Sequence, residues 1–153
     1  QAAEGEGGDI RGRQSAAVLV VAPESSGRPW ADRRVDLRVE DHTDPLGELS
    51  RLLRLHRAYE RMNAGDAVLE TGDAAGAAAE YHAALALAPE VYEIAFWSGI
   101  TLVGAGRLDE ARPLLAQAFA ARPSLRELVG RLPAAGLLPH DPELLAEIQA
   151  IGR

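Results

Sequence analysis

Residues 58 to 123 read AYERMNAGDAVLETGDAAGAAAEYHAALALAPEVYEIAFWSGITLVGAGRLDEARPLLAQAFAARP and contain one pattern twice. Laid on itself with an offset of 34 residues, the sequence pairs Gly65 with Gly99, Gly72 with Gly106, Ala77 with Ala111, Ala84 with Ala118, and Pro89 with Pro123. A period of this length with small residues at fixed places predicts units of two antiparallel helices joined by a tight turn.

The small residues have physical reasons to recur. Glycine inside a helix costs about 1 kcal/mol relative to alanine, so Gly65 and Gly99 predict places where two helices pack closely. Tyr81 and Leu115 occupy one equivalent place in the two units and are expected to fill the space between the helices. Gly72 and Gly106 follow apolar helical runs, as glycines that end helices do.

This stretch resembles the tetratricopeptide repeat family, with repeats at residues 58–91 and 92–125. The resemblance implies a mainly α fold, a solenoid of antiparallel helix pairs within a helical domain at 58–153. Behind the repeats, Ser124 and Glu127 have the spacing of a capping box and predict a helix over 124–132. Asp141-Pro142 predicts the start of a final helix, with the apolar stripe Leu144, Leu145, Ile148 and Ile151. These helices are expected to cap the solenoid.

In the tetratricopeptide family the first helix of each unit lines a concave groove, and the resemblance implies a candidate groove here. By register its lining residues are Tyr59, Met62, Asp66, Leu69, Glu70, Glu93, Phe96, Ile100 and Val103. Some members hold a peptide carboxylate with cations in this groove, but these positions offer none. An apolar, slightly acidic groove fits a helix or hydrophobic segment, from the chain itself or from a second subunit.

The residues before the repeats predict β structure. The apolar run SAAVLVVA at 15–22 predicts a strand buried on both faces. Residues 33–40 alternate apolar and charged side chains and predict a half-buried strand. Asp44-Pro45 predicts the start of a helix that runs up to or into the first repeat. An isolated hairpin is marginal in water, so we expect 15–22 to pair with another chain or to be poorly ordered.

The run GGDIRGRQSAAVLVV, followed by RVDLRVEDHTDPLGEL and a Leu-rich helix, resembles the carboxy-terminal end of an uncharacterised bacterial family assigned to the N-terminal-nucleophile (Ntn) hydrolases. The resemblance covers about residues 5–57 and implies an incomplete domain at 1–57, namely the last strands and helix of an αββα sandwich. In that superfamily the first residue of the catalytic chain, a Thr, Ser or Cys, is the nucleophile. Gln1 cannot act in this way, so no catalytic residue is expected in this chain.

Few residues of the sequence suggest a catalytic or metal-binding site. Asp9, Arg11, Arg13 and Gln14 form the one polar cluster that could face an Ntn site. Asp41-His42-Thr43-Asp44 has ligand-type side chains, but the capping role of Asp44 makes a metal site there the weaker interpretation. His56 and His82 are expected at the surface of helices. No metal and no cofactor are expected.

Composition and charge narrow the classes of partner. The net charge is −7, and residues 58–123 carry nine acidic side chains against four arginines. This balance argues against binding a phosphate backbone, and the sequence has no apolar run long enough for a membrane span. There is no cysteine and no lysine; the arginine, alanine and glycine usage suggests a GC-rich bacterial genome, and we expect a cytoplasmic location.

The sequence thus predicts a protein–protein or intersubunit interaction module that is not catalytic itself. Its expected partner is a protein or peptide segment or the domain upstream of the repeats, and we expect a homo-oligomer. The alternative is an accessory part of a bacterial Ntn-type amidohydrolase whose nucleophile lies upstream.

Overall fold

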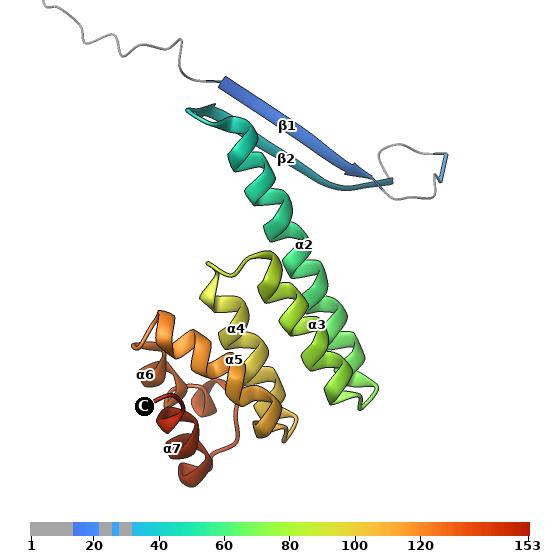
Figure 1. Ribbon diagram of the computed structural model, residues 1–153. Helices are drawn as coiled ribbons and strands as arrows, with labels where there is room; N and C mark the ends of the chain where they lie inside the picture. Colours follow the sequence, from blue (N-terminus) through green and yellow to red (C-terminus); the bar gives the residue numbers. More distant parts are fainter. Residues whose placement is uncertain (1–13, 22–25, 28–31) are drawn as a thin grey trace, which may run out of the picture. The chain divides into compact units, whose positions relative to one another are not determined.

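A computed structural model describes residues 14–21, 26–27 and 32–153 (Figure 1). The chain divides into two compact units, residues 1–54 and 55–153. The division falls three residues before the boundary predicted from the sequence. Each unit is described by itself below.

The described part of the first unit is a β-hairpin followed by the start of a helix. Strand β1, Gln14–Val21, pairs antiparallel with β2, Arg33–His42. Leu19 and Val21 are 52% and 53% exposed, so β1 is covered on one face at most. The expectation of a strand buried on both faces is not met by the described residues, because the face of β1 that carries Leu19 and Val21 is exposed.

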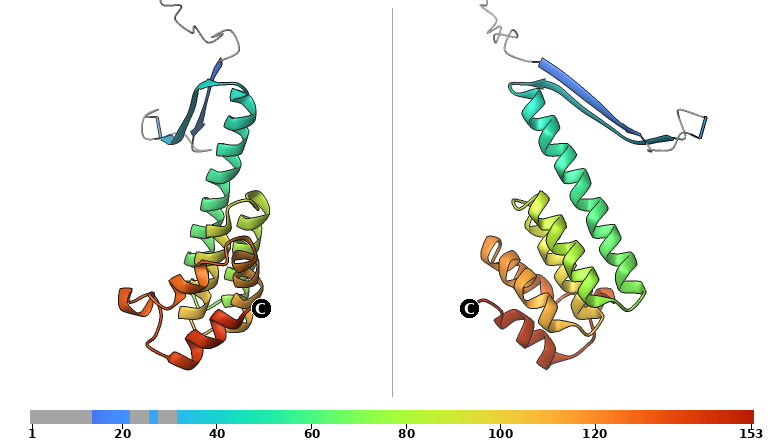
Figure 2. Two further views of the ribbon diagram at one scale, coloured as in Figure 1. Left: turned by 90° about the vertical axis from the view of Figure 1, so that its left-hand side faces the viewer. Right: turned by 45° about the vertical axis from the view of Figure 1, so that its right-hand side comes forward.

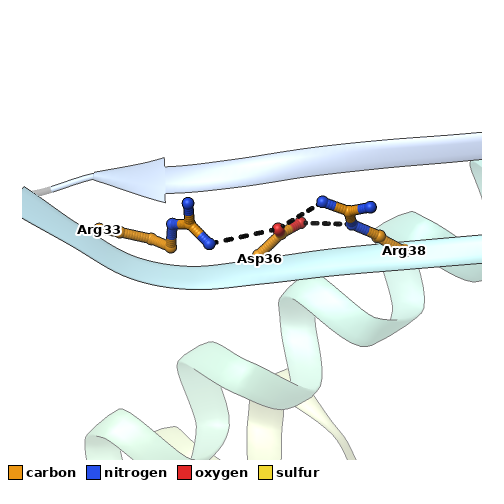
Figure 3. A network of polar contacts seen from close by, with 3 residues as sticks. All are labelled: Arg33, Asp36 and Arg38. Carbon is orange, nitrogen blue, oxygen red and sulfur yellow. Dashed lines mark hydrogen bonds and ion pairs between the residues drawn. The ribbon is translucent and has the colours of Figure 1, made fainter. Parts of the chain in front are cut away.

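Strand β2 has one apolar and one charged face, as its alternation predicts. Val39 is buried, whereas Asp36 lies on the opposite face between two arginines (Figure 3). Arg38 donates two hydrogen bonds to the Asp36 carboxylate, of 3.1 and 2.9 Å, and Arg33 Nη1 lies 3.7 Å from it. The hydrogen bonds from Arg38 lower the pKa of the Asp36 carboxyl below its ordinary value.

Helix α2, Pro45–Glu70, is one continuous element of 26 residues. Asp44 caps its N-terminus, since Oδ1 of Asp44 accepts the Gly47 backbone N–H at 2.9 Å. The helix therefore continues into the first repeat, one of the two possibilities that the sequence left open. The next glycine, Gly72, has a φ of +88°, the left-handed conformation that ends a helix.

The second unit continues with three helices arranged as repeated hairpins (Figure 2). They are α3 (Ala74–Leu87), α4 (Tyr92–Gly104) and α5 (Leu108–Ala121). Asp73 caps α3 by accepting the Gly76 N–H at 2.8 Å, and Gly106 ends α4 with a φ of +76°. Helix α4 packs against both α3 and α5, as stacked helix pairs require.

The two mid-helix glycines lie at the contacts that the sequence predicts. A Cβ atom at Gly65 would lie 2.5 Å from Tyr81 Cε1, and one at Gly99 would lie 2.7 Å from Leu115 Cγ. These two contacts are related by the 34-residue period, because both partners are shifted by the same number. Tyr81 and Leu115 are both fully buried. The repeat in sequence is therefore a repeat in packing.

The segment after α5 differs from the prediction in two respects, the length of its helix and its cap. Helix α6 spans only Leu125–Val129 and is followed by the short 3-10 helix η2, Pro133–Ala135. Ser124 forms no side-chain capping bond: it already has helical dihedrals, φ −64° and ψ −16°, whereas a capping residue needs an extended backbone. The expected capping box is wrong.

The final helix, α7 (Pro142–Ala150), begins as predicted, with Asp141 accepting the N–H groups of Glu143 and Leu144. Its Ile148 is fully buried, and Ile151 just after it is nearly so. Arg126 holds this end of the chain by donating to the carbonyl oxygens of Ile151 at 2.8 Å and Gln149 at 3.2 Å. Its guanidinium also lies 4.6 Å from the centre of the Phe119 ring.

Candidate functional site

The residues predicted to line the groove divide into two groups. On α4, Phe96 is 1% exposed, and Ile100 and Val103 are also buried. On α2, Tyr59, Asp66 and Glu70 are exposed, whereas Met62 and Leu69 are half-buried and pack against the core. Of the predicted lining, the structure therefore leaves the α2 residues and Glu93 of α4 accessible.

The chain itself covers the buried part of α4. Phe96, Ile100 and Val103 belong to one apolar cluster with side chains that follow α5, namely Val129, Leu132 and Leu138. The Leu137 carbonyl oxygen would lie 3.8 Å from a Cβ at Gly104, so the segment after η2 returns to the end of α4. Because Phe96 is buried, its replacement by alanine would destabilise the fold, and an effect on binding could not be separated from that loss.

One stripe of α4 remains accessible. Between Tyr92 and Gly104 the exposed residues are Glu93, Trp97, Thr101 and Gly104, spaced four, four and three residues apart. This spacing places them on one side of the helix. Trp97 is 39% exposed, and its ring meets the buried Phe96 ring edge to face at 4.9 Å. Phe96 thereby supports an exposed aromatic side chain.

The accessible stripe of α4 meets α2 at a surface pocket. The pocket has a volume of about 390 Å³ and is lined by Asp66, Leu69, Glu70 and Thr101. Trp97 precedes Thr101 by about one helical turn. We call the surface made by the following residues the α2–α4 face: Tyr59, Met62, Asp66, Leu69 and Glu70 from α2, and Glu93, Trp97 and Thr101 from α4.

A buried tyrosine positions Asp66 at the edge of the pocket. Tyr81 of α3 donates its hydroxyl hydrogen to Asp66 Oδ1 at 2.6 Å. Burial of the ring, together with this hydrogen bond, raises the pKa of the Tyr81 hydroxyl well above its ordinary value of 10.0. The phenol therefore stays protonated at neutral pH and continues to donate to Asp66.

The α2–α4 face is acidic. Asp66, Glu70 and Glu93 contribute carboxylates, and none of the three forms an ion pair with an arginine within the described ranges. Arg61 of α2 instead pairs with Glu80 of α3, with Nη1 to Oε2 at 2.9 Å. Arg61 and Arg57 line a different pocket beside Leu87. The positive charges of Arg57 and Arg61 thus lie on the α3 side of the helix.

The other predicted candidates supply no site. Asp9, Arg11 and Arg13 lie outside the described residues, and Gln14 begins β1. His42 Nδ1 accepts a hydrogen bond from the Asp44 N–H at 3.0 Å, so this histidine stabilises the turn between β2 and α2. His56 is half-buried rather than on the surface, with Nε2 3.5 Å from Glu60 Oε1. Nowhere in residues 14–21, 26–27 and 32–153 do three potential metal ligands come together.

Comparison with known protein families finds two matches, one in the helical part of the chain and one before it. Residues 68–132 match a family model described as a tetratricopeptide repeat, so this part of the chain is a tetratricopeptide repeat region. Residues 1–49 match a family of unknown function (DUF1028). No curated protein and no solved structure matches the chain.

These findings define a class of protein: tetratricopeptide repeats following an uncharacterised domain, and such repeats in general mediate contacts between proteins. The fold is mainly helical with one two-stranded antiparallel sheet among the described residues. None of the described helices combines the length and apolar character that crossing a membrane requires.

Proposed function

We propose that this chain is a protein-interaction module that binds a peptide segment on the α2–α4 face. The observation that carries the proposal is the exposed stripe of α4 beside the 390 Å³ pocket. The other residues of α4 are buried, apart from the half-buried Tyr92 at its start, so this stripe is where α4 can meet a partner. An exposed tryptophan supported by a buried ring is a typical anchor of protein interfaces.

A random dodecapeptide library displayed on phage would test the proposal. We expect the chain to select peptides whose affinity falls when Thr101→Arg places a large side chain over the pocket. Ala120→Arg is the matched control, because Ala120 is exposed on α5 and the change adds the same side chain elsewhere. Peptides that bind both variants equally well would show that the α2–α4 face is not the binding surface.

The hairpin supports a second proposal, that residues 1–57 are the end of an Ntn-hydrolase-like domain and that the repeats are its accessory part. Two observations support it: the match of residues 1–49 to a separate family, and the exposed Leu19 and Val21 of β1. Ser15–Val21 carries no charge, and an uncharged, unprotected strand edge favours pairing with a further strand.

That further strand belongs to the rest of such a domain or to a second copy of the chain, as in the predicted homo-oligomer. Light scattering after size exclusion distinguishes the two cases. If a second copy pairs with β1, the mass is that of an oligomer, and Leu19→Arg reduces it to that of a monomer. A monomer at all concentrations would reject pairing between copies. Hydrolase activity belongs to the proposal only for a protein that also contains the upstream nucleophile.

A further inference from the structure

We infer that the partner segment recognised by the α2–α4 face is cationic, and that one of its arginine or lysine side chains enters the pocket lined by Asp66, Leu69, Glu70 and Thr101. The inference rests on the proposed function and adds the chemistry of the partner to it. Three features of the face support it: its unpaired carboxylates, its exposed aromatic rings and the apolar wall of its pocket.

The α2–α4 face carries carboxylates without an arginine partner in the described part of the chain. Other acidic side chains of the helical unit are neutralised nearby: Glu80 by Arg61, Glu110 by Arg107, and Glu147 by Arg112. Glu70 and Glu93 have no such arginine among the described residues, although Glu70 lines the pocket. The chain thus supplies no compensating charge to these two carboxylates within the described residues. A cation from a partner would supply it, and an anionic segment would be repelled.

The aromatic rings favour the same occupant. Tyr59 is 46% exposed, and Trp97 is exposed on the helix that faces α2 across the pocket. A guanidinium or ammonium group over an exposed ring face is attracted by the electron density of the ring, most strongly for tryptophan. Trp97 lies about one turn before Thr101, so a segment that extends from the pocket along α4 towards Glu93 meets the indole ring.

The residues that line the pocket favour a long side chain with a charged end. Leu69 is half-buried and gives the pocket an apolar wall, whereas Asp66 and Glu70 place carboxylates at its edge. Arginine and lysine have an apolar stem with a charged end, which matches this combination. Asp66 is already held by the Tyr81 hydroxyl, so one of its oxygens is positioned before any partner arrives.

The test uses the complete chain and the same dodecapeptide library. We expect the selected peptides to be enriched in arginine or lysine, and replacement of those residues by glutamine to weaken binding about tenfold. Binding should weaken further between about 50 and 500 mM salt. The double variant Glu70→Gln/Glu93→Gln should lose about as much affinity as the peptide with glutamine.

Glu127→Gln/Glu143→Gln is the matched control, because it removes the same charge from two exposed residues of α6 and α7. It should bind the basic peptides like the original chain. Equal losses in both double variants would show that net charge alone attracts the peptides, and would overturn the inference. Neutral or acidic peptides that depend on Thr101 would overturn the inference and leave the proposed function standing. Selection of no peptide that depends on Thr101 would overturn both.

Discussion

Gly99→Ala is the most informative single change in the helical unit. The added Cβ would lie 2.7 Å from Leu115 Cγ and 2.8 Å from Leu115 Cδ2. Leu115 is fully buried, and its branching carbon cannot move aside as the end of a flexible chain could. Overpacking of this kind costs about 1–3 kcal/mol, while alanine in a helix returns about 1 kcal/mol relative to glycine. Since the contact is well below 3 Å, we expect a net loss of about 2 kcal/mol.

The control lies in the same helix. A Cβ at Gly104 would meet nothing nearer than the Leu137 oxygen at 3.8 Å, so Gly104→Ala should leave the free energy of unfolding unchanged or raise it by up to about 1 kcal/mol. Urea denaturation followed by circular dichroism measures both variants. In thermal denaturation, we expect the Tm of Gly99→Ala to fall by about 4–8 °C.

A double variant tests the cause of the loss. Leu115→Ala alone should destabilise the chain by about 2–5 kcal/mol through the cavity it leaves. In Gly99→Ala/Leu115→Ala the new methyl group enters that space, so the two losses should fail to add by about 2 kcal/mol. Strict additivity, or a Gly99→Ala variant as stable as the original chain, would refute the proposed helix contact.

Substitutions at three buried or half-buried polar residues of the helical unit should have the following effects. Ser98 Oγ is buried without a hydrogen-bond partner among the described residues, so Ser98→Ala should raise the free energy of unfolding by about 1 kcal/mol; a loss in urea denaturation would count against this. Tyr81 has a raised pKa in the fold, so its contribution to stability is complete below pH 10 and declines above it, by up to about 1.4 kcal/mol per pH unit. Tyr81→Phe should remove that decline, and an unchanged pH profile would contradict the assignment. Arg126→Ala should release the end of α7 and speed hydrogen exchange at Ile151, whereas exchange that stays slow would show that Arg126 does not hold this end.

The repeat architecture could be predicted because its causes are local and periodic. Gly65 and Gly99 are recognisable in sequence since glycine in a helix needs a reason, and the structure supplies it in Tyr81 and Leu115. Asp44 and Asp141 were recognisable as caps for a similar reason: a short acidic side chain directly before proline favours the start of a helix.

The part of the groove on α4 could not be predicted, because it depends on where a distant segment folds. The family register assigns Phe96, Ile100 and Val103 to the open lining, but they are buried in one apolar cluster with Phe119 of α5 and with residues after α5. The accessible stripe is displaced by one residue, to Trp97 and Thr101. One signal in the sequence could have indicated this: Trp97 and Thr101 share one helical side with Glu93, whereas Phe96, Ile100 and Val103 are all apolar and suit a core.

The central claim is that a partner binds on the α2–α4 face. The indole N–H signal of Trp97 in a ¹H–¹⁵N correlation spectrum tests this claim most directly. Titration with a peptide selected by the chain should shift this signal together with the backbone signals of Asp66, Leu69 and Thr101. Signals of Ala120 on α5 should stay in place. Shifts confined to α5 and α7, with the Trp97 signal unchanged, would contradict the account.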